Sequence, residues 1–256
     1  MNIYGSYDNS TTVLDEELIL NKFKLASQKI YEKIPCVRDI EYSFNSNSRT
    51  LDWFYQAVSY KETVVFIHGG YWQYCHKADF AFIVESLYEN GHDVILVGYG
   101  LAPENSISSI CDDINRALDF IQNRFYELGR ESDGCILVGH SAGAHLATYC
   151  NQHRLVKKVV AISGIYDLRP IIDTKFNHAL NLSDEEVDKY SVRKENIIKK
   201  TVLLYGENEL EEIKNQSILL GSEKDSNYID YYEVSKVNHF DILNNIFSKA
   251  NVKLFI

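Results

Sequence analysis

The apolar residues of this chain fall into short continuous runs that are separated by longer amphipathic stretches. The runs at 63–67 and 135–138 are apolar throughout rather than alternating, which is typical of parallel strands buried on both faces. Six further segments are predicted as strands: 39–44, 51–58, 93–98, 158–162, 201–205 and 228–234. The pattern therefore predicts a sheet of about eight strands.

Between these runs, apolar residues recur at the spacing of an α-helix. The stretch 14–33 is predicted as an amphipathic N-terminal helix. Further helices are predicted over 79–90, 108–128 and 142–153, and from Asp241 toward the C-terminus. The first two of these stop at glycines, which favour helix C-caps. Strands that alternate with helices predict an α/β fold with a mostly parallel, doubly wound sheet and helices on both faces.

The length of 256 residues fits a single α/β domain. Within it, residues 1 to about 35 are predicted to form a helical arm. Residues 167–200 are polar, lie between two core strands and contain a predicted short helix over 184–190. Because an insertion at this place follows the end of a strand, we expect it to form a small cap above the strand tips.

Residues 139–143 read G-H-S-A-G, directly after an apolar run and before a helix. This strand, tight turn and helix is the context of a nucleophile elbow in an α/β hydrolase. The turn strains the backbone of the serine, and the flanking glycines remove the Cβ clashes that would forbid it. Ser141 is therefore the predicted nucleophile.

A second motif, H-G-G-Y-W at residues 68–72, follows the strand that ends at residue 67. In α/β hydrolases an H-G-G segment after an early strand supplies oxyanion-hole amides. An anionic tetrahedral intermediate needs two or three fixed N–H donors, and glycines let the backbone approach it closely. The predicted donors are the amides of Ala142 and of Gly70, with Tyr71 or Gly69.

The general base is predicted from position, because among eight histidines only His239 follows the last predicted strand. The acid should follow an earlier strand, and the strand at 201–205 is followed by Glu207, Glu209 and Glu211. The usual spacing of a glycine, two residues and an acid selects Glu209. The predicted catalytic set is therefore Ser141, His239 and Glu209.

Composition excludes several classes of partner. The net charge is −10 and no dense stripe of Lys and Arg occurs, so no nucleic-acid partner is expected. The five cysteines are widely spaced without a C-x-x-C pair, which argues against a disulfide framework and against a metal site. No leader sequence is visible and no apolar run approaches the roughly 18 residues of a membrane span. We expect a cytoplasmic protein without a membrane partner.

Together these motifs resemble the kynurenine formamidase (arylformamidase) family of α/β hydrolases. The resemblance covers nearly the whole chain and begins faintly at Tyr7-Asp8-Asn9 and Val13. The similar stretches are residues 68–73 (H-G-G-Y-W-Q), 98–104 (G-Y-G-L-A-P-E), 139–146 (G-H-S-A-G-A-H-L), 163–170 (S-G-I-Y-D-L-R-P) and 238–241 (N-H-F-D). Two positions depart from the family pattern, which usually has aspartate where Glu209 and Asn238 stand.

The resemblance implies a serine hydrolase that needs no cofactor and no metal and that cleaves N-formylkynurenine to kynurenine and formate. Tyr71, Trp72 and Tyr166 are predicted to wall the aromatic part of such a substrate. A carboxylesterase acting on small acyl esters would use the same residues. A non-catalytic ligand-binding member of the fold is a third reading, which rests on the Glu209 substitution. Assembly is left open, with a homodimer as one option.

Overall fold

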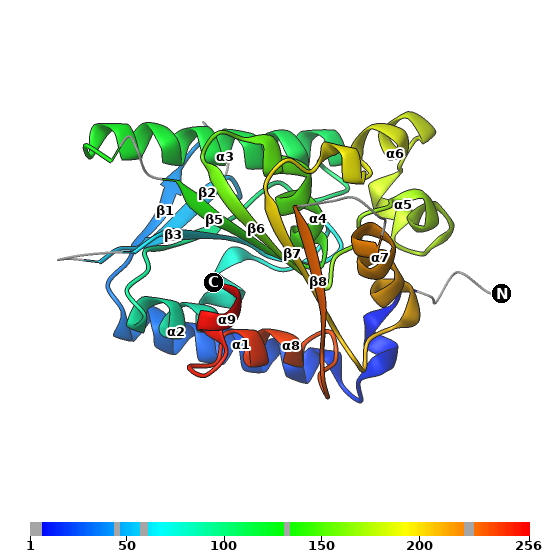
Figure 1. Cartoon of the computed structure of the whole chain (residues 1–256), viewed down its shortest axis with the longest axis horizontal. Helices are drawn as coiled ribbons and strands as arrows, with labels where there is room; N and C mark the ends of the chain where they lie inside the picture. Colours follow the sequence, from blue (N-terminus) through cyan, green and yellow to red (C-terminus); the bar gives the residue numbers. More distant parts are fainter. Residues whose placement is uncertain (1–6, 44–46, 57–60, 131–133, 223–227) are drawn as a thin grey trace.

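The computed structural model describes residues 7–43, 47–56, 61–130, 134–222 and 228–256 (Figure 1). Eight strands form one sheet in the order β1-β2-β4-β3-β5-β6-β7-β8. β1 and β2 pair antiparallel, as do β2 and β4, and the remaining neighbours are parallel. The strands are β1 (Val37–Glu41), β2 (Thr50–Phe54), β3 (Thr63–Ile67), β4 (Val94–Val97), β5 (Cys135–His140), β6 (Val156–Ile162), β7 (Lys200–Gly206) and β8 (Ile229–Val234). The predicted mostly parallel sheet is confirmed.

Two hydrophobic clusters cover the two faces of this sheet, because side chains along a strand alternate between faces. In β3, Val65 and Ile67 belong to one cluster, while Val64 and Phe66 belong to the other. All four side chains are almost completely buried. This double burial explains why the central strands are apolar at every position.

Helices form a layer over each face (Figure 1). The layer drawn at the top and right contains α3 (Ile107–Glu127), α4 (Ala142–Tyr149), α5 (Asn177–Leu180), α6 (Asp184–Tyr190) and α7 (Glu211–Ser222). The opposite layer contains α1 (Glu16–Lys33), the 3₁₀ helix η3 (Lys77–Ile83), α2 (Val84–Glu89), α8 (Asp241–Ile246) and α9 (Val252–Phe255). Within the described residues, no helix is long and apolar enough to cross a bilayer.

Three of the predicted helices are divided in the structure, and the one that begins at Asp241 is α8 followed by α9. The segment predicted at 79–90 is η3 followed by α2, and η3 begins at a capping box in which His76 and Asp79 bond to each other's backbone N–H groups. The segment predicted at 142–153 is α4 followed by the 3₁₀ helix η4 (Cys150–Gln152). Asn151 Nδ2 donates to the Thr148 carbonyl, and such side-chain bonds compete with regular helix hydrogen bonds. Residue 44 of one predicted strand, residues 57 and 58 of another and residues 1–6 of the predicted N-terminal arm lie outside the described residues.

The segment 167–200 contains the 3₁₀ helices η5 (Arg169–Asp173) and η6 (Lys194–Asn196) besides α5 and α6. Its Phe176 stacks on Tyr71, with ring centroids 3.7 Å apart and an interplanar angle of 6°. The Phe176 carbonyl accepts a hydrogen bond from Gln73 Nε2 at 2.9 Å. The segment therefore packs on the turn that follows β3.

A buried ion cluster attaches η3 to the antiparallel edge of the sheet. The side chains of Lys77 and Asp52 are completely buried, and Lys77 Nζ lies 2.8 Å from Asp52 Oδ1. Lys77 also binds Asp39 at 2.7 Å, and the Tyr31 hydroxyl donates to Asp52. Since a buried charge requires a partner, each of these groups depends on the others.

We predict that Lys77→Met destabilises the protein by about 3–5 kcal/mol, because it leaves the Asp52 carboxylate buried without its cation. The matched control is Lys33→Met, which breaks a solvent-exposed pair with Glu85 and should cost less than about 1 kcal/mol. Urea unfolding of both variants measures the difference. Equal losses in the free energy of unfolding would show that the buried cluster contributes no more to stability than an exposed ion pair.

Candidate active site

The loops that carry the predicted catalytic residues meet at one edge of the sheet. Parallel strands end on the same side, so the segments after β3, β5, β7 and β8 gather there. The beginning of α1, drawn in blue, lies at this same edge (Figure 1). Residues far apart in sequence are thereby brought to one place.

Ser141 stands between β5 and α4 with φ 56° and ψ −120°, a strained conformation for a residue with a side chain. Its amide donates to the Ile162 carbonyl at 2.8 Å, which fixes the turn on β6. A Cβ at Gly139 would lie 2.0 Å from the Gly143 carbonyl oxygen, and one at Gly143 would lie 2.1 Å from that of Ile67. Both glycines are therefore required by close backbone contacts, and the turn has the geometry of a nucleophile elbow.

His239 and Glu209 form a buried hydrogen-bonded pair. His239 Nδ1 lies 3.0 Å from Glu209 Oε2, and the two side chains are 4% and 0% exposed. An ionised carboxylate at this distance accepts the Nδ1–H and leaves Nε2 as the basic nitrogen. His239 and Ser141 line the same cavity, so this nitrogen and the serine hydroxyl share one space.

The second carboxylate oxygen of Glu209 is also held. Oε1 accepts from the Ser163 hydroxyl at 2.6 Å and from the Gly206 amide at 2.7 Å. Three donors thus fix a side chain that is one methylene longer than aspartate. Ser163 itself has φ 55°, in the left-handed region.

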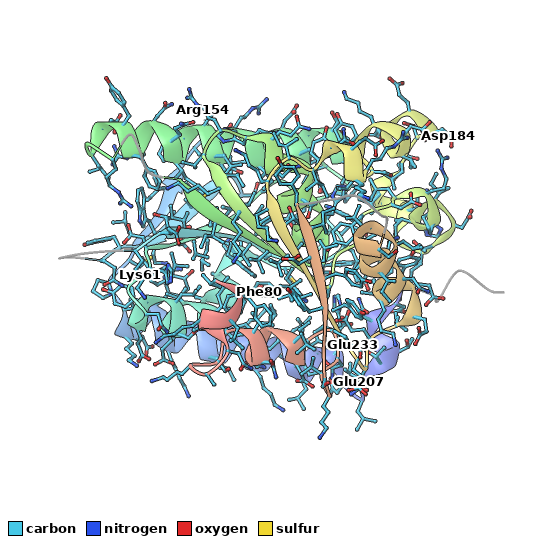
Figure 2. All side chains as sticks on the ribbon, in the orientation of Figure 1. Lys61, Phe80, Arg154, Asp184, Glu207 and Glu233 are labelled. Atoms are coloured by element: carbon cyan, nitrogen blue, oxygen red, sulfur yellow. The ribbon has the colours of Figure 1, made fainter. Side chains whose placement is uncertain are left out.

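The alternative acids stand elsewhere. Glu207 is exposed at the periphery of the molecule (Figure 2), where its Oε2 accepts from the Lys236 amide at 2.8 Å. Glu211 is exposed and pairs with Lys214. Of the three glutamates, the structure brings Glu209 to the histidine.

His140, the second residue of the G-H-S-A-G motif, supports the loop of the candidate base. Its Nε2 donates to the carbonyl of His239 at 2.9 Å, and the two rings lie 4.7 Å apart. Complete burial lowers the pKa of His140 well below its usual value, and the neighbouring His239 lowers it further. His140 is therefore a neutral donor that positions the His239 backbone.

The H-G-G turn lies directly against the elbow. A Cβ at Gly69 would lie 2.9 Å from the His140 carbonyl oxygen and 3.0 Å from the Ser141 Cβ. Gly70 has φ +109°, and its carbonyl accepts from two amides that close the turn. Gly70 and Tyr71 line the cavity at Ser141, whereas Gly69 packs beneath them. Ala142 is the first residue of α4, so its N–H has no carbonyl partner in a preceding helical turn.

A cavity of about 400 Å³ surrounds Ser141 and His239. Helix α1, the H-G-G turn, η3 and the loop after β8 each contribute to its wall. The lining is mostly apolar, with Leu20, Phe23, Phe80 and Phe240, and it also contains Asn9, Glu16, Lys24, Tyr74, Cys75 and Asp79. A small molecule with an aromatic or aliphatic part fits such a wall.

The three aromatic residues predicted as substrate contacts have different positions. Tyr71 lines the cavity, and its hydroxyl is held by hydrogen bonds with Tyr7 and Asn9. Trp72 is completely buried, packs edge-on against His145 at 5.4 Å and does not line this cavity. Its predicted contact with substrate is therefore corrected to core packing.

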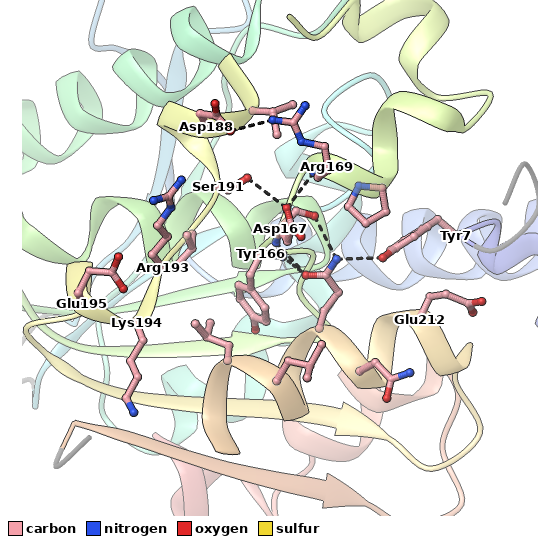
Figure 3. A pocket seen from close by; sticks show the side chains of 17 residues that line it. Tyr7, Tyr166, Asp167, Arg169, Asp188, Ser191, Arg193, Lys194, Glu195 and Glu212 are labelled. Atoms are coloured by element: carbon pink, nitrogen blue, oxygen red, sulfur yellow. Dashed lines mark hydrogen bonds and ion pairs between the residues drawn. The ribbon is translucent and has the colours of Figure 1, made fainter. Parts of the chain in front are cut away.

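Tyr166 lines a different cavity, of about 570 Å³, beside α6 and α7 (Figure 3). In that cavity Gln216 Oε1 accepts from the amides of Tyr166 and Asp167, and Gln216 Nε2 donates to the Tyr7 hydroxyl. Arg169 pairs with Asp188. These groups satisfy one another and lie away from Ser141, so the predicted substrate contact of Tyr166 is also corrected.

Several site residues were not identified from sequence. Ser163 binds Glu209 and belongs to the S-G-I-Y-D-L-R-P stretch. The position of this stretch directly after a strand is the signal that could have placed it near the acid. Asn9 and Glu16 come from the N-terminal arm, which no sequence spacing connects to Ser141. Among the described residues, no group of three or more His, Cys, Asp and Glu side chains could hold a metal ion.

Comparison with known proteins gives curated relatives that match about half of this chain. The kynurenine formamidase of Danio rerio is 33% identical over 130 residues, which are 48% of this chain and 43% of that protein. The isoprenylcysteine alpha-carbonyl methylesterase of Arabidopsis thaliana is 26% identical over 154 residues, 51% of this chain and 36% of that protein. The matched segments thus span less than half the length of these curated relatives.

A crystal structure from Silicibacter sp., provisionally described as a thioesterase, has a TM-score of 0.88 at 21% identity. It covers 100% of this chain and 99% of its own. The family model described as BD-FAE matches residues 51–244, a range that contains β3, β5, β7 and β8, the four strands whose following segments carry the site. The chain has the α/β-hydrolase fold and belongs to the BD-FAE family.

Proposed function

We propose that this protein is a serine hydrolase that cleaves an aryl formamide, with N-formylkynurenine as the substrate and kynurenine and formate as the products. The observation that carries the proposal is the buried Glu209–His239 hydrogen bond in the wall of the cavity that contains the strained Ser141. Similarity to kynurenine formamidases supports the choice of a formamide.

In the first half of the reaction, Ser141 Oγ attacks the formyl carbon while His239 Nε2 takes its proton. Glu209 holds the imidazole in the tautomer that leaves Nε2 free, and it stabilises the imidazolium that forms. The negative charge on the carbonyl oxygen is placed against the amides of Gly70, Tyr71 and Ala142. The H-G-G turn and the elbow are in direct contact, so these donors are fixed before substrate binds.

The tetrahedral intermediate then collapses. The C–N bond breaks as the His239 imidazolium gives its proton to the departing aniline nitrogen, which leaves a formyl ester on Ser141. Water attacks this ester while His239 takes its proton, which gives a second tetrahedral intermediate. When this intermediate collapses, the His239 imidazolium returns the proton to Ser141 Oγ and formate is released. An aniline is expelled more easily than an alkyl amine, so a site built like that of an esterase suffices.

A carboxylesterase acting on small acyl esters is the second candidate. The apolar wall formed by Leu20, Phe23 and Phe240 and the similarity to isoprenylcysteine methylesterases favour it. The interpretation as a non-catalytic binding protein is disfavoured, because the Glu209 carboxylate lies 3.0 Å from His239 Nδ1 despite the substitution of aspartate.

We expect Ser141→Ala to lower kcat for N-formylkynurenine and for p-nitrophenyl acetate by at least about ten-thousandfold, because both reactions need the nucleophile. Ser86→Ala, in α2 on the opposite side of the fold from α4, serves as the control and should retain activity. Steady-state kinetics on folded protein provide the measurement. Retained turnover of both substrates by the Ser141 variant would exclude the mechanism.

The triad acid is tested by comparing Glu209→Gln with Glu207→Gln. An amide at position 209 turns an N–H toward His239 Nδ1 and favours the wrong tautomer, so kcat should fall by about a thousandfold or more. The exposed Glu207 variant should retain the original kcat. A larger loss at Glu207 than at Glu209 would overturn the assignment.

Acyl specificity separates the two candidate functions. Ser141 is only 2% exposed beneath the H-G-G turn, so we expect kcat/KM for N-formylkynurenine to exceed that for its N-acetyl analogue by at least about tenfold. The same comparison with phenyl formate and phenyl butyrate controls for leaving group. Efficient hydrolysis of the butyrate without cleavage of either amide would identify an esterase instead.

A further inference from the structure

One wall of the catalytic cavity carries polar groups that the proposed triad does not use. Asn9, which precedes α1, and Glu16, the first residue of α1, both line the cavity with Ser141 and His239. Two other charged side chains line it. Asp79 is engaged by the His76 amide at 2.9 Å, and Lys24 is exposed two turns farther along α1. This leaves Asn9 and Glu16 as the polar side chains of the wall that could recognise a ligand.

The orientation of the Asn9 amide follows from its neighbours. The Tyr71 hydroxyl has a single hydrogen, which it donates to the Tyr7 carbonyl. Its oxygen must therefore accept from Asn9, whose backbone N and Nδ2 lie at 3.2 and 2.7 Å. This leaves Asn9 Oδ1 as an acceptor that is buried without a partner, in a residue that is 1% exposed. A buried acceptor of this kind is costly unless a ligand donor satisfies it.

Glu16 supplies a negative charge at the same wall. It is the first residue of α1, after the N-cap Asp15, and within the described part of the chain its side chain makes no ion pair and no hydrogen bond. Burial raises its pKa, and Asp8 raises it further, while His239 and Lys175 act in the opposite direction. Lys175 pairs with Asp8 rather than with Glu16. The carboxylate therefore lines the same cavity as the candidate base, and among the described residues no cation pairs with it.

We infer that Asn9 Oδ1 and the Glu16 carboxylate form a subsite for a primary ammonium group of the substrate. An ammonium offers three donors and one positive charge, which match one neutral acceptor and one free carboxylate. The inference deepens the proposed function and rests on it, because kynurenine and its N-formyl derivative carry an α-ammonium group beyond the aromatic ring. The subsite would select aryl formamides that are amino acids over neutral aryl formamides.

Ligand binding tests the subsite without requiring turnover. We would measure Kd by calorimetry for kynurenine and for the analogue that lacks only its α-amino group, with wild type, Glu16→Gln and Glu17→Gln. Wild type should prefer kynurenine, and Glu16→Gln should reduce the ratio of the two affinities by about tenfold. Glu17 is the adjacent, exposed residue of the same helical turn, so its variant controls for helix charge and should keep the wild-type ratio.

A double-mutant cycle adds Asn9→Ala. If both side chains bind one ammonium, the losses in affinity for kynurenine should be non-additive by more than about twofold. An unchanged affinity ratio in Glu16→Gln, or equal affinity of wild type for the two ligands, would overturn the subsite. Cleavage of N-formylkynurenine by wild type is measured separately. Absence of cleavage with a preserved affinity ratio would refute the proposed reaction while leaving the ammonium subsite supported.

Discussion

The geometry of this site depends on the direct contact of two backbone turns. The elbow after β5 and the H-G-G turn after β3 approach so closely that a methyl group on Gly143 would lie 2.1 Å from the Ile67 carbonyl oxygen. A methyl on Gly69 would meet the His140 carbonyl at 2.9 Å. Since β3 and β5 are paired neighbours in the sheet, the sheet register itself sets this contact. The candidate nucleophile and the candidate oxyanion amides are thus positioned by main chain, whose conformation a bound substrate cannot easily alter.

The candidate catalytic acid, Glu209, illustrates how a side chain longer than aspartate can be held against the histidine. Glu209 has an additional rotatable bond compared with aspartate, and holding it costs conformational entropy. The Gly206 amide and the Ser163 hydroxyl bind one carboxylate oxygen and leave the other for His239. Because Ser163 follows β6 and Gly206 ends β7, this support again comes from the ends of adjacent strands.

The sequence predicted the strands and the catalytic motifs because both depend on local pattern. Continuous apolar runs identified β3 and β5, and the position of Glu209 after a strand selected the glutamate that lies against His239. It could not distinguish a buried aromatic residue from one that lines a cavity. Trp72 and Tyr71 are adjacent in the same motif, yet the turn conformation directs one into the core and the other to the cavity. The contribution of Asn9 depends on long-range packing with Tyr71, which leaves no local pattern.

The charge around the candidate base His239 depends on two other buried histidines, His140 and His68, which are kept neutral. His140 touches the candidate base, and burial lowers its pKa well below the usual range. His68, stacked on Tyr99 at 4.4 Å, has a pKa lowered to about 4 by the same cause. Neither ring adds a positive charge that would oppose formation of the His239 imidazolium. In the proposed mechanism the imidazolium forms against the Glu209 carboxylate, beside a cavity that Glu16 also lines. Burial thus keeps His140 and His68 neutral, whereas the buried His239 has the Glu209 carboxylate as its partner.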